Sequence, residues 1–308
     1  MRGYKIFAGS ASVDFANEIC QILDVPLANA DVKKFSDGEI SVQIAESVRG
    51  RDVFIVQSTG APSNDNLMEL LIMTDALRRS SASSITAVVP YYGYARQDRK
   101  AAPRVPITAK LVADMYETAG IDRVVTIDLH AGQIQGFFNI PVDNLYGSIT
   151  FEHYIKSKNL KNPIIASPDI GGVARARYFA KRMGLDMVIV DKRREKANES
   201  EVMNIIGDVT GKDVIMIDDM VDTAGTMVKA ASALKNKGAT SVMACATHGV
   251  LSGKAYDNLE NGELDELIIT NTLVTKPHKK INVLSVAPLF AEVIRRVYHN
   301  ESVNSLFA

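Results

Sequence analysis

Short runs of apolar residues alternate along the chain with segments in which apolar residues recur every three or four positions. The short runs predict β-strands, and several are apolar throughout, as expected of strands buried on both faces of a sheet. The predicted strands are Tyr4–Ala8, Val53–Gln57, Thr86–Pro90, Arg123–Asp128, Pro163–Ser167, Met187–Val190, Val214–Asp218, Val242–Thr247, Glu266–Thr270 and Ile281–Ser285.

Four segments between these runs carry an apolar stripe with helical spacing. The stripes are Phe15, Ile19 and Leu23; Leu67, Leu71, Thr74 and Leu77; Ile107, Leu111 and Met115, on a helix that begins at Pro106; and Met227, Ala230, Ala231 and Leu234. Strands that alternate with helices predict parallel sheets covered by helices on both faces. We therefore expect an α/β fold with mainly parallel sheets.

The length of 308 residues is enough for about two domains. The least structured stretch between the two series of elements is 143–148, so we predict one domain over 1–146 and a second over 147–308. Two α/β halves of similar length suggest duplication of one unit, although no repeat is visible residue by residue. The tail from about residue 288 is a candidate to pack back on the first domain.

Composition narrows the class of protein. Hydrophobic residues make up 46%, and 35 Lys and Arg nearly balance 36 Asp and Glu, for a net charge of −1. This excludes a disordered chain and argues against a protein that coats nucleic acid. Cys20 and Cys245 are expected to be buried core residues, without a disulfide or a cysteine metal site. No apolar stretch reaches the roughly 18 residues of a membrane span, which predicts a cytoplasmic protein without a membrane partner.

The segment 214–226 carries the most chemical information. An apolar strand ends in Asp218 and Asp219, and a loop of small residues opens the next helix. The loop consists of Asp222, Thr223, Ala224, Gly225 and Thr226. Backbone N–H groups at a helix N-terminus suit a phosphate, and the threonines add hydroxyl donors. Carboxylates would repel a phosphate, so Asp218 and Asp219 are expected to accept hydrogen bonds from sugar hydroxyls. An ordinary helix cap is the alternative.

Other segments stay open when only their residues are considered. No Walker A motif, dinucleotide glycine fingerprint or kinase signature is present. The basic loop 91–104 is either a polyphosphate site or a solvated loop, and 36–39 is typical of a turn. His130 is either structural or a ligand. The polar segment 192–201 is either a solvated hairpin or a lid over a polyphosphate. Asp169, at the end of a predicted strand, is poorly explained without a ligand.

The loop at 218–226 resembles the phosphoribosyl-pyrophosphate motif of type I phosphoribosyltransferases and of ribose-phosphate pyrophosphokinases. Five further segments resemble signatures of the pyrophosphokinases alone: Phe35–Glu39, Tyr91–Lys100, Asp128–Phe138, Ser167–Gly172 and Asp191–Arg194. The resemblance runs from Ile6 to the C-terminal tail. The chain is therefore identified as a member of the pyrophosphokinase family, of the phosphate-regulated bacterial type, which implies two similar phosphoribosyltransferase-like domains.

The resemblance also implies an activity and its residues. The activity is the Mg²⁺-dependent transfer of the diphosphoryl group of ATP to the 1-hydroxyl of ribose 5-phosphate, which gives 5-phosphoribosyl 1-diphosphate (PRPP) and AMP for nucleotide biosynthesis. Implied roles are ATP binding by Asp37, Gly38, Glu39, Arg96 and Gln97; Mg²⁺–ATP binding by His130 and Asp169; catalysis by Lys192 and Arg194; and ribose 5-phosphate binding by Arg194, Asp218, Asp219, Asp222, Thr223, Ala224, Gly225 and Thr226.

The family further implies a homohexamer, in which Asp37 and Glu39 reach the ATP of a neighbouring subunit. A regulatory site for phosphate and ADP would include Ser47, Arg49 and Arg78. The segment 80–84 lacks a basic residue often found near its end in the family, which weakens the expectation of this regulation. A second departure is Ala224, at a position that is often glycine.

Two other functions remain as alternatives. A type I phosphoribosyltransferase would consume PRPP at the same loop, and it would not need the ATP segments around Arg96 and His130. A non-catalytic regulatory subunit of the pyrophosphokinase should have lost or interrupted the lysine lid, whereas Lys192 and Arg194 are present.

Overall fold

The computed structural model describes residues 3–193 and 202–306 of the chain. It divides into two compact units, each of which is described below by itself. Unit 1 consists of Met1–Tyr146, Thr272–Val274 and Val286–Ala308. Unit 2 consists of Gly147–Asn271 and Thr275–Ser285. None of the helices in the described ranges is both long enough and apolar enough to cross a membrane.

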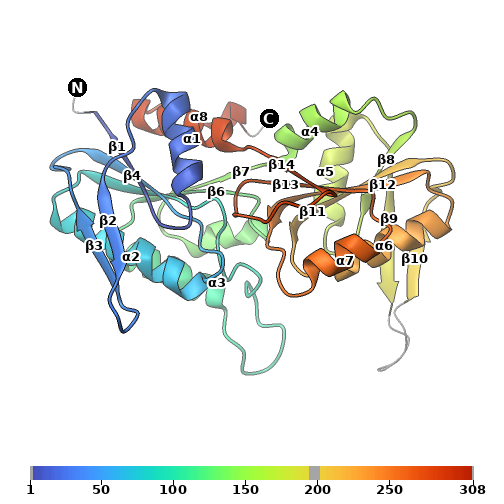
Figure 1. Ribbon diagram of the computed structural model, residues 1–308, viewed down its shortest axis with the longest axis horizontal. Helices are drawn as coiled ribbons and strands as arrows, with labels where there is room; N and C mark the ends of the chain where they lie inside the picture. The colour runs from blue at the N-terminus through green and yellow to red at the C-terminus, as the bar shows by residue number, and fades with distance from the viewer. Residues whose placement is uncertain (1–2, 194–201, 307–308) are drawn as a thin grey trace. The chain divides into compact units, whose positions relative to one another are not determined.

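Unit 1 is built on a five-stranded parallel sheet with the strand order β1-β4-β5-β6-β7 (Figure 1). Its strands are β1 (Lys5–Ala8), β4 (Asp52–Val56), β5 (Ser84–Val88), β6 (Arg123–Ile127) and β7 (Val142–Leu145). A separate antiparallel hairpin is formed by β2 (Ala30–Lys34) and β3 (Ile40–Ile44).

The prediction that 143–148 is the least structured stretch is wrong, because most of it belongs to β7 and to the start of the next helix. The polar residues of β7 hid the strand from a search for apolar runs. Asp143 is nevertheless buried, and it accepts a hydrogen bond from Nη1 of Arg123 at 2.6 Å. Asn144 is also buried, and its Oδ1 accepts from the backbone N–H of Leu129 at 3.1 Å.

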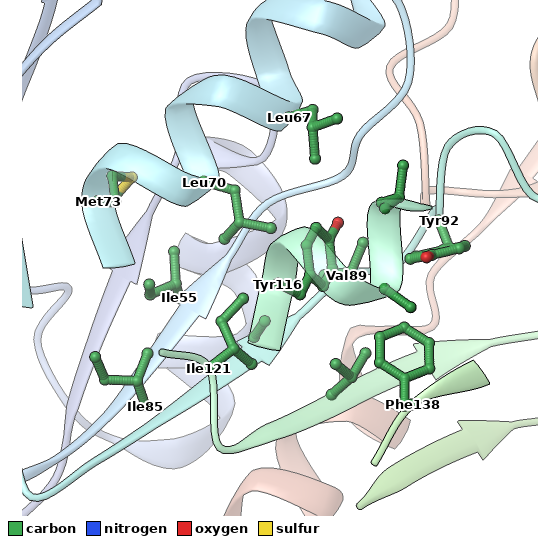
Figure 2. Close-up of a cluster of buried hydrophobic side chains, with 14 of the residues drawn as sticks. Ile55, Leu67, Leu70, Met73, Ile85, Val89, Tyr92, Tyr116, Ile121 and Phe138 are labelled. Carbon is green, nitrogen blue, oxygen red and sulfur yellow. The ribbon is translucent and has the colours of Figure 1, made fainter. Parts of the chain in front are cut away.

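Helices cover both faces of this sheet. On one face lie α1 (Val13–Leu23) and α8 (Ala287–His299), where the rings of Phe15 and Phe290 meet edge-on with centroids 5.4 Å apart. On the other face lie α2 (Ser63–Arg79) and α3 (Thr108–Ala119). Figure 2 shows how Leu70 and Met73 of α2 and Tyr116 of α3 converge on the strands in this second core.

Helix α3 differs from its prediction in its start and in its buried face. It begins at Thr108 rather than at Pro106, and Leu111 of the predicted stripe is 56% exposed. The buried residues are instead Ala109, Val112, Ala113 and Tyr116. Two alanines let the helix approach the sheet closely, and the tyrosine fills the remaining space, so the bulkiest aliphatic side chains do not mark the buried face.

Unit 2 is built on a seven-stranded sheet with the order β10-β9-β8-β11-β12-β13-β14. Its strands are β8 (Pro163–Ser167), β9 (Met187–Arg193), β10 (Val202–Ile206), β11 (Asp213–Val221), β12 (Ser241–Gly249), β13 (Glu266–Thr270) and β14 (Ile281–Leu284). Strand β10 pairs antiparallel with β9, and the other pairs are parallel. Helices α4 (Ser148–Ser157) and α5 (Val173–Met183) cover one face, and α6 (Gly225–Asn236) and α7 (Ala255–Asn261) cover the other.

The two units repeat one order of elements. Unit 1 runs strand, helix, hairpin, strand, helix, strand, helix and two strands from β1 to β7, and unit 2 repeats this order from β8 to β14. This shared order is what duplication of one ancestral unit would leave behind. The predicted α/β fold with mainly parallel sheets flanked by helices is confirmed.

Smaller predictions have mixed outcomes. Cys20 and Cys245 are buried in the cores, as predicted. His153 lies on the exposed face of α4. The strand predicted over Val242–Thr247 extends to Gly249 in β12, so that it includes His248, which is 2% exposed. A histidine at the end of a buried strand interrupts the apolar run that marks the strand.

Candidate active site

Two adjacent carboxylates lie near the carboxyl end of β11. Successive residues of a strand face opposite sides of the sheet. Ile217 faces the α4 and α5 side, and Asp219, two residues later, contacts Arg175 of α5 on the same side. Asp219 is 3% exposed, whereas the side chain of Asp218 is 23% exposed. A parallel α/β sheet binds its ligands at this end of its strands.

The pair is held by an arginine that was not predicted from the sequence. Nη1 of Arg175, on α5, lies 3.0 Å from Oδ1 of Asp219 and 3.6 Å from Oδ1 of Asp218. The backbone N–H of Asp219 also donates to Oδ1 of Asp218 at 2.8 Å. Burial, and next the charge of Asp219, raise the pKa of Asp218 to about 8, and Arg175 opposes this rise.

The loop from Asp222 to Thr226 presents backbone donors. Ala224 precedes α6 with φ 59°, in the left-handed region, and no side chain caps the helix. Within the described residues, the backbone N–H groups of Thr223, Ala224, Gly225 and Thr226 donate to no acceptor. Consecutive N–H groups at a helix N-terminus, next to a residue with positive φ, form an anion-binding concavity.

The acceptors of the same loop are occupied by its neighbours. The hydroxyl of Ser252 donates to the carboxylate of Asp222, and the backbone N–H of Ser252 donates to the Asp222 carbonyl at 3.1 Å. Nδ2 of Asn258 donates to the carbonyl oxygen of Thr223 at 2.8 Å. These contacts hold the carbonyl and carboxylate groups of the loop in place.

Gly225, the first residue of α6, has room for a side chain. A Cβ atom built on Gly225 would come no closer than 3.7 Å to another atom, the hydroxyl oxygen of Thr223. No described atom of the chain therefore requires glycine at this position. A bound ligand that approaches the backbone would require it.

The corresponding loop of unit 1, between β4 and α2, is closed by its own protein contacts. The backbone N–H of Ser58 donates to Oγ of Ser12 at 2.9 Å, and that of Thr59 donates to the carbonyl of Tyr91 at 2.9 Å. A Cβ built on Gly93 would lie 2.3 Å from the carbonyl oxygen of Thr59, which shows how tightly this loop is packed. Of the two loops, the one in unit 2 is suited to an anion.

Asp169 follows β8 in unit 2 and is half-buried. Its Oδ1 accepts a hydrogen bond from the backbone N–H of Gly172 at 2.8 Å, just before α5 begins. His130 follows β6 in unit 1 and is exposed. In the described part of the chain, no group of three or more His, Cys, Asp or Glu side chains could hold a metal ion without help from a ligand.

The residues predicted to bind ATP lie in unit 1. Asp37, Gly38 and Glu39 form the exposed turn between β2 and β3, where Gly38 has φ 95°. Arg96 and Gln97 are exposed in the loop that follows β5. Oγ1 of Thr108 donates to Oε1 of Gln97 at 2.5 Å, so the amide nitrogen of Gln97 is the group turned away from α3.

The predicted regulatory residues come from two segments that the structure brings together. The backbone N–H of Gly50 donates to the carbonyl of Ser81 at 2.8 Å. This bond joins the loop that carries Ser47 and Arg49 to the end of α2, which carries Arg78. All three side chains are exposed.

The predicted catalytic residues lie at the end of β9. Lys192 occupies the register position opposite Met203 of β10. Arg194 lies outside the described residues. The rest of the segment up to residue 201 also lies outside the described residues, so both interpretations of 192–201 stay predictions.

Comparisons with known proteins agree over the whole chain. Residues 4–120 match the model of the N-terminal domain of ribose phosphate pyrophosphokinase, and residues 193–308 match that of the phosphoribosyl synthetase-associated domain. The ribose-phosphate pyrophosphokinases of Wolinella succinogenes and Campylobacter jejuni are each 74% identical over 308 residues, which cover 100% of both chains.

A solved structure agrees as well. The crystal structure of phosphoribosylpyrophosphate synthetase from Mycobacterium smegmatis superposes with a TM-score of 0.92 at 44% identity, and the match covers 97% of this chain and 99% of that one. With full-length relatives at this identity, the chain belongs to the ribose-phosphate pyrophosphokinase family.

Proposed function

We propose that this protein transfers the diphosphoryl group of Mg-ATP to the 1-hydroxyl of ribose 5-phosphate, with PRPP and AMP as products. The observation that carries the proposal is the row of backbone donors from Thr223 to Thr226, which have no acceptor within the described residues and lie on the same strand–helix connection as the carboxylates of Asp218 and Asp219. Donors for a phosphate and acceptors for hydroxyls, a few residues apart, match the two ends of a sugar phosphate.

In this proposal the 5-phosphate binds the loop of Asp222, Thr223, Ala224, Gly225 and Thr226. Thr223 and Thr226 are exposed, and their hydroxyls would add donors to the backbone N–H groups. Asp218 and Asp219 accept hydrogen bonds from the 2- and 3-hydroxyls. The 1-hydroxyl, which is the nucleophile, then remains free to meet the β-phosphorus of ATP.

ATP is proposed to bind at Arg96 and Gln97, together with Asp37, Gly38 and Glu39 of a neighbouring copy of the chain. An amide nitrogen directed away from α3 makes Gln97 a donor toward the nucleotide. The shared site requires self-association, and we propose the homohexamer of the family. Phosphate and ADP are proposed as regulators at Ser47, Arg49 and Arg78, and the cytoplasm as the location of the enzyme.

Magnesium fits the donors available for it. Mg²⁺ keeps several waters and uses one or two carboxylates together with substrate phosphates, so it needs no cage of protein ligands. Asp169 offers one half-buried carboxylate whose Oδ1 is oriented by Gly172, and His130 would act through water or phosphate. The ion supplies charge neutralisation on the polyphosphate when Mg-ATP is bound.

Phosphoryl transfer of this kind is mainly alignment and charge stabilisation. The phosphate loop and the two aspartates fix both ends of the acceptor. Lys192 and Arg194 are proposed to stabilise negative charge on the transferring and leaving groups. No described residue is assigned as an obligatory general base.

The test is to incubate the pure protein with Mg-ATP and ribose 5-phosphate in phosphate buffer and to follow AMP and PRPP. We expect AMP to form only when the sugar phosphate is present. Absence of AMP would overturn the proposal. Consumption of added PRPP with a free base would instead support the phosphoribosyltransferase.

A further inference from the structure

Arg175 contacts both members of the acidic pair, although it lies more than forty residues earlier in the chain. We propose that Arg175 is a positioning residue, which fixes the Asp218–Asp219 pair in the orientation that receives the ribose hydroxyls. This inference rests on the proposed function of the pair and assigns a role to a residue outside its motif.

The geometry makes one guanidinium the common partner of two carboxylates. Nη1 of Arg175 lies 3.0 Å from Oδ1 of Asp219 and 3.6 Å from Oδ1 of Asp218. The Asp219 side chain is only 5% exposed, so its orientation depends on a protein donor rather than on water. The Arg175 side chain is 26% exposed, which places it at the border between the core and the ligand end of the sheet.

The arginine itself is held by its helix. Its neighbours on α5, Ala176 and Phe179, are buried in the core against Ile215 and Ile217 of β11. This packing fixes the distance between α5 and the strand that carries the carboxylates. Arg175 can therefore transmit a fixed orientation to Asp219, as the outer partners of a binding site do.

Removal of the guanidinium would leave two adjacent carboxylates without this cation. Mutual repulsion would then turn one carboxylate away or raise the pKa of Asp218 further. Either change removes an acceptor from the pair, so the loss falls on the hydroxyls of the sugar and not on its phosphate. A lysine would restore the charge but not the planar donor that reaches both carboxylates.

The test compares Arg175→Met and Arg175→Lys with the unaltered protein and with Arg177→Met. Arg177 is exposed on the same helix and is the matched control. Calorimetry measures the binding of ribose 5-phosphate and of 2-deoxyribose 5-phosphate, and thermal unfolding checks the fold of each variant. Steady-state assays give KM for ribose 5-phosphate and for ATP.

We expect Arg175→Met to weaken ribose 5-phosphate binding about tenfold or more, the scale of a hydrogen bond to a charged group. Binding of 2-deoxyribose 5-phosphate should weaken less, so that discrimination between the two sugars falls, and KM for ATP should stay within about twofold. The affinity of Arg175→Lys for ribose 5-phosphate should lie between those of Arg175→Met and the unaltered protein, and the affinity of Arg177→Met should equal that of the unaltered protein. If Arg175→Met does not fold, Arg175→Lys decides with the same readouts.

Equal losses for both sugars, or unchanged binding of both, would overturn the positioning role. Equal losses together with a lower unfolding temperature would mean that Arg175 only joins α5 to β11. Sugar binding is measured without turnover, so it is independent of the proposed reaction. If the unaltered protein binds ribose 5-phosphate but forms no AMP, the proposed reaction is refuted, and the binding data of the variants still decide whether Arg175 positions the pair.

Discussion

Gly225 offers a substitution in which stability and ligand binding should move in opposite directions. Its Cβ would lie 3.7 Å from the Thr223 hydroxyl and 3.8 Å from Nδ2 of Asn258, both ordinary contacts. Its φ is not in the left-handed region, and it is the first residue of α6. Gly225→Ala should therefore fit the folded chain without strain.

The two magnitudes follow from different principles. Replacing glycine at a compatible position stabilises a protein by about 0.4–1 kcal/mol, because the unfolded chain loses freedom. The methyl group would, however, lie in the row of donors from Thr223 to Thr226, where the proposed phosphate approaches the backbone. Displacement of a phosphate from one charge-assisted hydrogen bond costs about 1.5–3 kcal/mol, or about 10- to 150-fold in affinity.

Calorimetry of ribose 5-phosphate binding and thermal unfolding of the free protein measure the two effects. Gly136→Ala is the matched control, since a Cβ there meets nothing within 4 Å and φ is again outside the left-handed region. We expect Gly225→Ala to unfold at the same or a higher temperature and to bind the sugar phosphate at least about tenfold more weakly. A Gly225→Ala protein with unchanged affinity would refute the assignment of the phosphate to this loop.

Three further predictions concern other residues. Lys192→Ala should lower kcat by about 100-fold or more while thermal unfolding stays unchanged, and a fully active variant would contradict its catalytic role. The pKa of Asp218 is about 8 in the folded chain and near 3.9 in an unfolded chain, so Asp218 makes the fold less stable as pH rises between these values. The unfolding temperature of Asp218→Asn, measured relative to that of the unaltered protein, should therefore be higher at pH 9 than at pH 5. A difference that does not change with pH would contradict this. Hydrogen bonds from Arg295 and Arg296 lower the pKa of Glu292 to about 2. The stabilising effect of Glu292 is therefore present above about pH 4.3, the pKa of an unfolded chain, and is lost as pH falls toward 2. Glu292→Gln should unfold at a lower temperature than the unaltered protein at pH 7, and the two unfolding temperatures should lie closer together near pH 3.

The strands that could be predicted are those whose side chains are apolar on both faces. β11 and β12 are examples, because parallel strands between two helical layers need a continuous apolar run. β2, with the sequence Ala-Asp-Val-Lys-Lys, lies outside the main sheet and stays largely exposed. β7 is buried, but its polar residues are paired with Arg123 and with a backbone N–H. Such pairing depends on tertiary contacts that periodicity does not contain.

The same limit applies to the site. Asp218, Asp219 and the loop that follows are close in the chain, so a strand followed by a small-residue turn was enough to predict them together. The sequence also suggested donors for a phosphate, and the left-handed backbone of Ala224 now explains why that position favours glycine. The contact of Arg175 with Asp218 and Asp219 could not be predicted, because it depends on which face of the sheet α5 covers.

The central claim is that both terminal phosphates of ATP move together to the 1-hydroxyl of ribose 5-phosphate. The most direct measurement uses ATP labelled with ³²P at the β-phosphate in one reaction and at the γ-phosphate in another, with product separation after a single turnover. We expect either label to appear in PRPP, with one equivalent of unlabelled AMP. Formation of ADP, with the β label retained in the nucleotide, would contradict the claim.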